Sequence, residues 1–236
     1  MTLIELEDFD PPTDSAGIEY PDCDGNLMSD NTTHGDAIEY VAGVARTVVQ
    51  SDPNAFSAAD HLWYYREGDP TMRVAPDVYV VFGRPKGHRG RYLQWAEAGI
   101  APQFVFEVVS PNNRAATAAK VFLYDELGVD EYVIYDPGYD RDGDLDVSKR
   151  SLRGFCRNED GRAVLIEDLA GSASARLGFI YGWDEHGLLC LLRPDGTVFP
   201  RYEVALALVE KARTEADEQR ARADALEAEL ARLRRH

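Results

Sequence analysis

The segment 103–136 constrains the fold more than any other part of the chain. It contains an apolar strand, QFVFEVVS (103–110), then an amphipathic helix over 113–127 that Gly128 ends, then a second short strand, DEYVIYD (130–136). A strand–helix–strand run of this length is typical of a crossover between parallel strands, in which the helix packs against a sheet. The segment therefore predicts an α/β fold, with a mixed β-sheet core flanked by helices.

The flanking sequence extends this core on both sides. Apolar residues at helical spacing predict a helix from about Thr32 to about Gln50. Apolar, β-branched and aromatic residues predict strands over 55–65 and 74–82, and turn-rich sequence predicts short antiparallel strands over 145–195. We therefore expect three regions: an irregular arm at 1–32, a globular α/β domain at 33–198 and a helical tail at 199–236.

The tail is rich in alanine, glutamate and arginine, and it contains neither glycine nor proline after Pro200. Its apolar positions alternate spacings of three and four and form a heptad seam: Val209, Ala212, Ala216, Gln219, Ala223, Leu226, Leu230 and Leu233. Such a seam predicts a coiled coil, with a homodimer favoured. The alternative is a solitary charged helix that is stabilised by ion pairs four residues apart.

Bulk properties narrow the class of protein. The net charge of −17 argues against a protein that coats nucleic acid, but not against an enzyme with a local basic surface. No apolar run approaches the roughly 18 residues of a membrane helix, and the acidic N-terminus lacks the basic start of a secretory signal. The three cysteines are far apart, so we expect a reducing compartment and a cytoplasmic location.

Two carboxylates lie in or beside the apolar strands. Asp77 precedes the strand that ends at Phe82, and Glu107 lies inside the strand 103–110. A buried carboxylate is unfavourable unless it is paired or binds a metal, and Mg²⁺ prefers oxygen ligands. Lys120, on the following helix, would offset charge at a phosphate. This set is the minimum for metal-assisted phosphodiester hydrolysis; the alternative is a structural Glu107 ion pair without catalysis.

Three strings carry a resemblance to a known family: PDVYVVF (76–82), APQFVFEVVSPNNR (101–114) and K-x-x-x-Y-x-x-x-G-V-x-E-Y-x-x-x-D-P (120–137). Together they resemble the Uma-two family of bacterial endonucleases, within the PD-(D/E)XK nuclease superfamily. The resemblance covers most of residues 18–200. It implies a restriction-endonuclease-like fold for the domain at 33–198, DNA as the partner and Mg²⁺ or Mn²⁺ as the cofactor.

The resemblance also implies roles for individual residues. Asp77 and Glu107 would be metal ligands, and the carbonyl oxygen of Val108 would be a further ligand. The superfamily lysine normally lies two residues after the acid, where this chain has Val109. Lys120 would replace it from the helix, so Asp77, Glu107 and Lys120 form the expected catalytic set.

Further candidates remain open at this point. An acid of the first helix, Asp36 or Glu39, would complete the site, although each would equally be a solvated surface residue. Asp60 is another candidate, with a structural carboxylate as the alternative. The basic loop after Phe82 leaves the strand begun by Asp77, so we expect it to flank the site and grip phosphate. The candidate phosphate-binding residues are Arg84, Lys86, Arg89, Arg91 and, on the crossover helix, Arg114. The alternative for this loop is a solubilising surface loop, or one that pairs with the acidic N-terminal arm.

The sequence thus predicts a Mg²⁺- or Mn²⁺-dependent endodeoxyribonuclease that dimerises through its tail. The competing hypothesis is a catalytically inactive, nuclease-like assembly protein that uses the coiled coil to recruit partners. The departure at Val109 and the acidity of the chain favour the second hypothesis, whereas the set of Asp77, Glu107 and Lys120 favours the first.

Overall fold

The computed structural model describes residues 16–23, 25 and 29–234 of the 236-residue chain. Most of the arm expected at 1–32 lies outside these residues. The chain divides into two compact units, Met1–Phe199 and Pro200–His236, and each is described by itself. The first unit contains the sheets, and the second contains one long helix.

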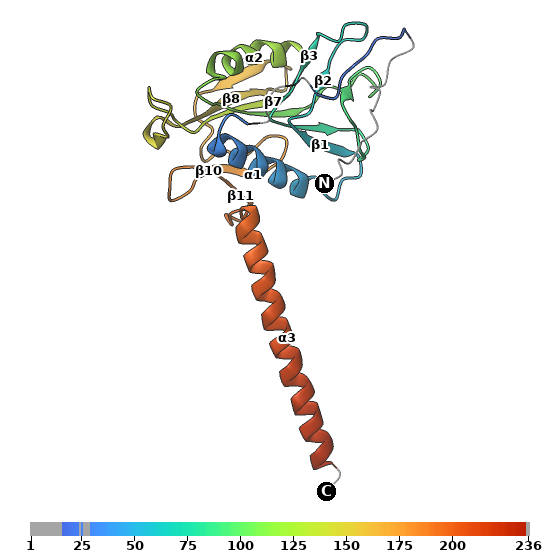
Figure 1. Ribbon diagram of the computed structural model, residues 1–236, viewed down its shortest axis with the longest axis vertical. Helices are drawn as coiled ribbons and strands as arrows, with labels where there is room; N and C mark the ends of the chain where they lie inside the picture. Colours follow the sequence, from blue (N-terminus) through green and yellow to red (C-terminus); the bar gives the residue numbers. More distant parts are fainter. Residues whose placement is uncertain (1–15, 24, 26–28, 235–236) are drawn as a thin grey trace, which may run out of the picture. The chain divides into compact units, whose positions relative to one another are not determined.

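A six-stranded sheet forms the centre of the first unit (Figure 1). In spatial order its strands are β1 (Ala55–Ala59), β4 (Val78–Phe82), β6 (Phe104–Val108), β7 (Glu131–Asp136), β8 (Ser151–Arg157) and β9 (Ala163–Ile166). β6 and β7 are parallel and are joined by α2 (Arg114–Glu126), whereas the other neighbours are antiparallel. The sheet is therefore mixed, and the crossover and the α/β class predicted from the sequence are confirmed.

The two helices of the first unit cover opposite faces of this sheet (Figure 1). α1 (Thr32–Val48) packs on the face that includes Phe106 and Val108, and α2 covers the face that includes Val105. All five residues of β6 are buried. Because successive side chains of a strand point to opposite faces, Glu107 is directed towards α2.

Two smaller sheets complete the unit. One contains β3 (Arg73–Val74), β2 (Trp63–Tyr64) and β5 (Tyr92–Leu93) in spatial order; the other is the hairpin of β10 (Ile180–Trp183) and β11 (Leu189–Leu192). A short 3-10 helix, η1 (Val147–Lys149), precedes β8.

The segments 55–65 and 74–82 each form two short strands in different sheets, where the sequence predicted one. In the first segment, Asp60 has a φ of 44° and turns the chain between β1 and β2. Aspartate tolerates this left-handed conformation better than most residues other than glycine. Hydrophobic and aromatic content alone does not reveal such a break.

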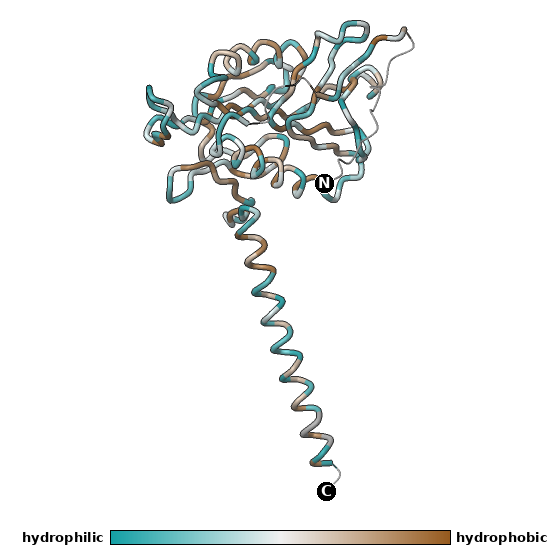
Figure 2. The backbone as a smooth tube through the Cα atoms, in the orientation of Figure 1, coloured by the Kyte–Doolittle hydropathy of each residue, from teal (hydrophilic) through white to brown (hydrophobic). Residues whose placement is uncertain are grey.

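The second unit contains α3 (Tyr202–Leu233), a single helix of 32 residues. Figure 2 shows hydrophobic positions distributed along a largely hydrophilic helix. The seam residues Val209, Leu226, Leu230 and Leu233 each have more than half of their surface exposed within the chain. In the part of the chain that the structure describes, no helix combines the length and the apolar character needed to cross a bilayer.

Candidate functional site

Three acidic residues lie in or next to neighbouring strands of the central sheet: β1, β4 and β6. β4 pairs antiparallel with β6 and places Val78 opposite Phe106, so the next step of the register places Asp77 opposite Glu107. On the other side, the amide of Asp60, at the end of β1, donates to the carbonyl oxygen of Asp77 at 3.1 Å. The sheet topology therefore brings together carboxylates that are far apart in the sequence.

Glu107 is 1% exposed and accepts hydrogen bonds from two side chains of α2. The Nζ of Lys120 lies 2.9 Å from Oε1 and 2.8 Å from Oε2, and the hydroxyl of Tyr124 donates to Oε1 at 2.7 Å. Residues 120 and 124 are four apart, so they share one face of the helix. Because α2 belongs to the crossover, this face packs against the strand that carries Glu107.

The charged residues around Glu107 alter one another's pKa. Burial raises the pKa of Glu107 to about 7, and the neighbouring Asp77 adds to the rise, while Lys120 and Tyr124 act in the opposite direction. Burial acts to lower the pKa of Lys120, but Glu107, Asp77 and Asp60 more than offset it, so this pKa is raised. Lys120 is therefore a cation at neutral pH, surrounded by an excess of carboxylates.

Asp77 is held by the backbone of β6. Its Oδ2 accepts a hydrogen bond from the amide of Val108 at 2.6 Å, and its side chain is 13% exposed. The carbonyl oxygen of Val108 accepts from Nδ2 of Asn113 at 3.0 Å. A carbonyl oxygen has a second lone pair, so this bond leaves it able to take a further partner.

From α1, the side chain that reaches the site is His34. Its Nε2 lies 3.5 Å from Oδ2 of Asp77, whereas Asp36 and Glu39 are exposed. The expectation that Asp36 or Glu39 completes the site is not supported by this geometry, because the helical period directs both away from the sheet. The sequence held the signal: His34 is in line with the apolar stripe of Ile38, Val41 and Ala45.

The basic loop after β4 does not flank this group. The amides of Gly83 and Arg84 donate to the carbonyl oxygen of Asn54, which precedes β1, whereas Asp77 neighbours the other end of β1. The loop therefore leaves β4 at the opposite end of the strand from Asp77, and the expected position of the loop beside the site is wrong. The error arose because Asp77 begins β4 and the loop begins where β4 ends.

The cations of that loop have partners within the chain. Arg84 and Arg89 both bind Glu97 at 2.6 Å. Lys86 donates to the carbonyl oxygen of Val49 at 2.9 Å, and Arg91 pairs with Asp22. These contacts match the alternative of internal pairing, including one pair with the N-terminal arm, and they leave no support for a phosphate grip.

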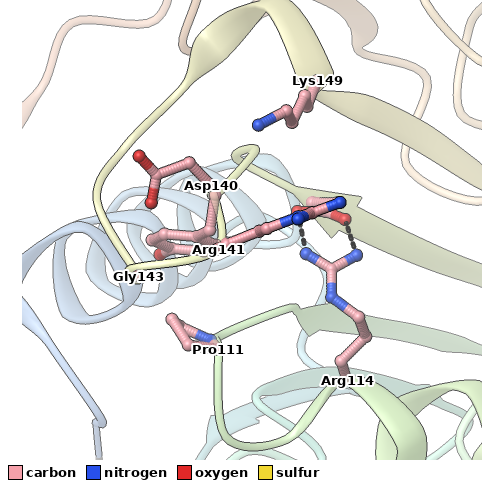
Figure 3. Close-up of a pocket in the computed structure, with 8 residues that line it drawn as sticks. Pro111, Arg114, Asp140, Arg141, Gly143 and Lys149 are labelled. Carbon is pink, nitrogen blue, oxygen red and sulfur yellow. Dashed lines mark hydrogen bonds and ion pairs between the residues drawn. The ribbon is translucent and has the colours of Figure 1, made fainter.

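Arg114, at the start of α2, also has a partner. Its Nη1 lies 2.6 Å from Oδ2 of Asp136, which is buried at the end of β7 (Figure 3). The pair borders a cavity of about 410 Å³ lined by Pro111, Arg114, Asp136, Tyr139, Asp140, Arg141, Gly143 and Lys149. Half of the Arg114 side chain is exposed, so it remains accessible from this cavity.

Among the residues that the structure describes, no cluster of three or more histidine, cysteine, aspartate or glutamate side chains is arranged to hold a metal ion. The donors that approach each other are His34 and Asp77, with the backbone of Val108 beside them. Glu107 is turned to Lys120 and Tyr124. A carboxylate offers about four lone-pair sites, and these two partners use three, so Glu107 keeps one. By type, these oxygen and imidazole donors suit a divalent cation, but the described residues do not group Glu107 with His34 and Asp77.

A comparison with protein families identifies a nuclease family. A family model described as "Uma2: Putative restriction endonuclease" matches residues 5–188, which include the sheet, both of its helices and the group around Glu107. Among solved structures, the chain is similar to a putative nuclease belonging to DUF820 from Anabaena variabilis ATCC 29413. The identity is 14% and the TM-score 0.43, over 66% of this chain and 75% of that chain. The comparison with curated proteins gave no match.

Proposed function

The chain belongs to the Uma2 family of putative restriction endonucleases, and we propose that it is a metal-dependent endonuclease that hydrolyses DNA phosphodiester bonds. The observation that carries the proposal is the buried Glu107, held by Lys120 on a helix and placed opposite Asp77 by the strand register. A buried carboxylate beside a second carboxylate is unfavourable unless positive charge, such as a bound cation, compensates it.

Asp77, Glu107 and the carbonyl oxygen of Val108 would hold Mg²⁺ or Mn²⁺, because each keeps an oxygen lone pair for it. The hydrogen bond from the Val108 amide to Oδ2 of Asp77 fixes the orientation of this carboxylate, and a second lone pair remains on that oxygen. A bound divalent cation supplies Lewis acidity and positive charge at the phosphate. The chain itself supplies the orientation of the oxygen donors and the exclusion of solvent around Glu107.

We infer that Lys120 takes the role of the catalytic lysine. Its side chain is 27% exposed while that of Glu107 is 1% exposed, so part of Lys120 lies at the surface next to the buried carboxylate. This cation would offset the negative charge that grows on a phosphate during attack. Val109, at the usual position of the lysine, is buried and apolar and cannot take this role.

The alternative is a nuclease-like assembly protein without catalytic activity. The observation that favours it is the close Glu107–Lys120 pair, which satisfies both groups without any metal. In either case we infer that α3 self-associates, because Leu226, Leu230 and Leu233 are exposed along a heptad seam. A dimer would present two sites to a DNA duplex.

Cleavage of supercoiled plasmid and of single-stranded DNA, with Mg²⁺ or Mn²⁺, tests the proposal. Asp77→Asn, Glu107→Gln and Lys120→Met are each expected to lower the rate roughly 100-fold or more, since each removes a charge from the site. Lys211→Met is the matched control, because Lys211 is exposed on α3 and pairs with Glu215. Activity should survive in this control.

Circular dichroism shows whether each variant is folded. If the wild-type protein cuts neither substrate and binds neither cation, the assembly-protein alternative replaces the nuclease. If it cuts and Lys120→Met cuts equally well, Lys120 is not the catalytic lysine.

A further inference from the structure

His34 is a buried polar residue that the proposed chemistry does not yet use. Its side chain is 5% exposed, and among the described residues its Nε2 has no hydrogen-bond partner. Buried polar atoms are rarely left without a partner, and such an atom in a native fold calls for an explanation. In this case the unpaired nitrogen is directed at Asp77, a proposed metal ligand.

The separation of the two atoms is informative. Nε2 of His34 and Oδ2 of Asp77 are 3.5 Å apart, which is longer than a good hydrogen bond. Two donors that each bind one ion at about 2.1 Å are about 3.0–3.4 Å apart, for right-angle or tetrahedral arrangements. The observed distance therefore suits two ligands of a common cation better than a donor and its acceptor.

We propose that Nε2 of His34 is a nitrogen ligand of the cation held by Asp77 and Glu107. The inference rests on the proposed metal site and adds to it a prediction of which ion the site prefers. Imidazole suits first-row transition ions, whereas Mg²⁺ is bound through oxygen. With a histidine in the set, the site should select Mn²⁺, and still more Co²⁺, over Mg²⁺.

The surroundings of the other ring nitrogen are compatible with this role. Nδ1 of His34 accepts a weak hydrogen bond from the amide of Asp30 at 3.3 Å. This bond must break when Nε2 binds an ion, because Nδ1 then carries the hydrogen of the ring. The carboxylate of Asp30 is close enough to act on the pKa of His34, and carboxylates commonly accept the second N–H of a metal-binding histidine.

The protonation of His34 is biased by the same neighbours. Burial acts to lower the pKa of His34, but the Asp77 carboxylate and, to a smaller extent, Asp30 and the Val108 backbone act to raise it, and the net shift is upward. A divalent cation would act in the opposite direction, because only the neutral ring can bind it.

A spectroscopic experiment tests the nitrogen ligand directly and needs no turnover. The full-length protein is loaded with Mn²⁺ and its electron spin echo modulation is recorded, once with ordinary histidine and once with ¹⁵N-labelled histidine. We expect modulation from a directly bound nitrogen that changes with the label. His34→Gln should abolish this signal, whereas His186→Gln, at a 77% exposed histidine, should leave it unchanged.

Calorimetric titration of metal-free protein gives the second readout. His34→Gln should weaken Mn²⁺ binding roughly 10-fold or more, because an imidazole ligand is lost, and should weaken Mg²⁺ binding much less. The labelling experiment on wild-type protein keeps the test valid even if His34→Gln folds poorly.

The outcomes separate this inference from the proposed function. If Mn²⁺ binds in an Asp77-dependent manner without a histidine nitrogen, His34 is not a ligand, while the site of Asp77 and Glu107 stands. If Mn²⁺ and Mg²⁺ do not bind at all, both the nitrogen ligand and the metal-dependent nuclease are overturned.

Discussion

The buried carboxyl group of Glu107 should make the metal-free protein less stable as the pH rises. Its pKa in the folded chain is about 7, against 4.5 for an ordinary glutamate. The folded state therefore binds this proton more tightly than the unfolded state does. Its contribution to stability is fully present below pH 4.5 and is lost as the pH rises through 7.

The size of the effect follows from the shift in pKa. One pKa unit corresponds to about 1.36 kcal/mol, so a shift from 4.5 to about 7 amounts to about 3 kcal/mol in total. Between about pH 5 and about pH 8, some 2.5 kcal/mol of this should appear as a loss in the free energy of unfolding. Urea denaturation in the presence of a chelator, at these two pH values, measures it.

Glu107→Gln removes the titrating group and nearly keeps its shape, so the variant should lack this loss. Other groups that titrate in this range, His34 among them, are present in both proteins, and their contributions cancel to first order in the difference. Glu159→Gln, in an exposed turn, is the control and should follow the wild-type curve. If wild type and Glu107→Gln lose stability in parallel, the argument for a buried, proton-binding Glu107 is refuted.

Three further predictions concern other parts of the structure. Tyr124→Phe removes a hydrogen bond to Glu107 and should lower the free energy of unfolding by about 1.5–3 kcal/mol in urea at neutral pH; an unchanged value would contradict the bond. Gly154→Ala should destabilise by several kcal/mol, because a Cβ there would overlap a backbone carbonyl of β7, whereas Gly43→Ala, on an open helix position, should stabilise by up to about 1 kcal/mol. Equal melting temperatures for the two glycine variants would refute that contrast. Leu226→Asp should shift the protein towards monomer in sedimentation velocity, and a wild-type monomer would rule out the coiled coil.

The crossover could be predicted because its signals are local. The apolar strand, the helix ended by Gly128 and the second strand each show their own periodicity, and the length between them permits a parallel pair. The break at Asp60 could not be predicted, because a positive φ at one aspartate depends on the contacts made by the strands on both sides. Local propensity gives way to tertiary context at such positions.

The loop cations illustrate why a basic cluster is weak evidence for a binding surface. Their charge was visible in the sequence, but their partners were not, because Glu97 and Asp22 approach only after the chain has folded. Whether a cation is available to a ligand depends on such internal pairs. The position of the loop is a different case: Asp77 precedes β4 and the loop follows it, so the order of residues along the chain already puts the two at opposite ends of this strand.

By itself, the sequence determined the elements whose information lies within a few turns of chain: the crossover, the first helix, the long tail helix, and the polar residues set into apolar strands. It also carried the family motifs that indicate Asp77, Glu107 and Lys120. Only the tertiary structure decided which side chains meet. It placed His34 beside Asp77 and turned Asp36 and Glu39 to solvent. The physical reason is that periodicity along the sequence determines which face of a helix or strand is buried. What that face contacts is determined by the packing of the whole chain.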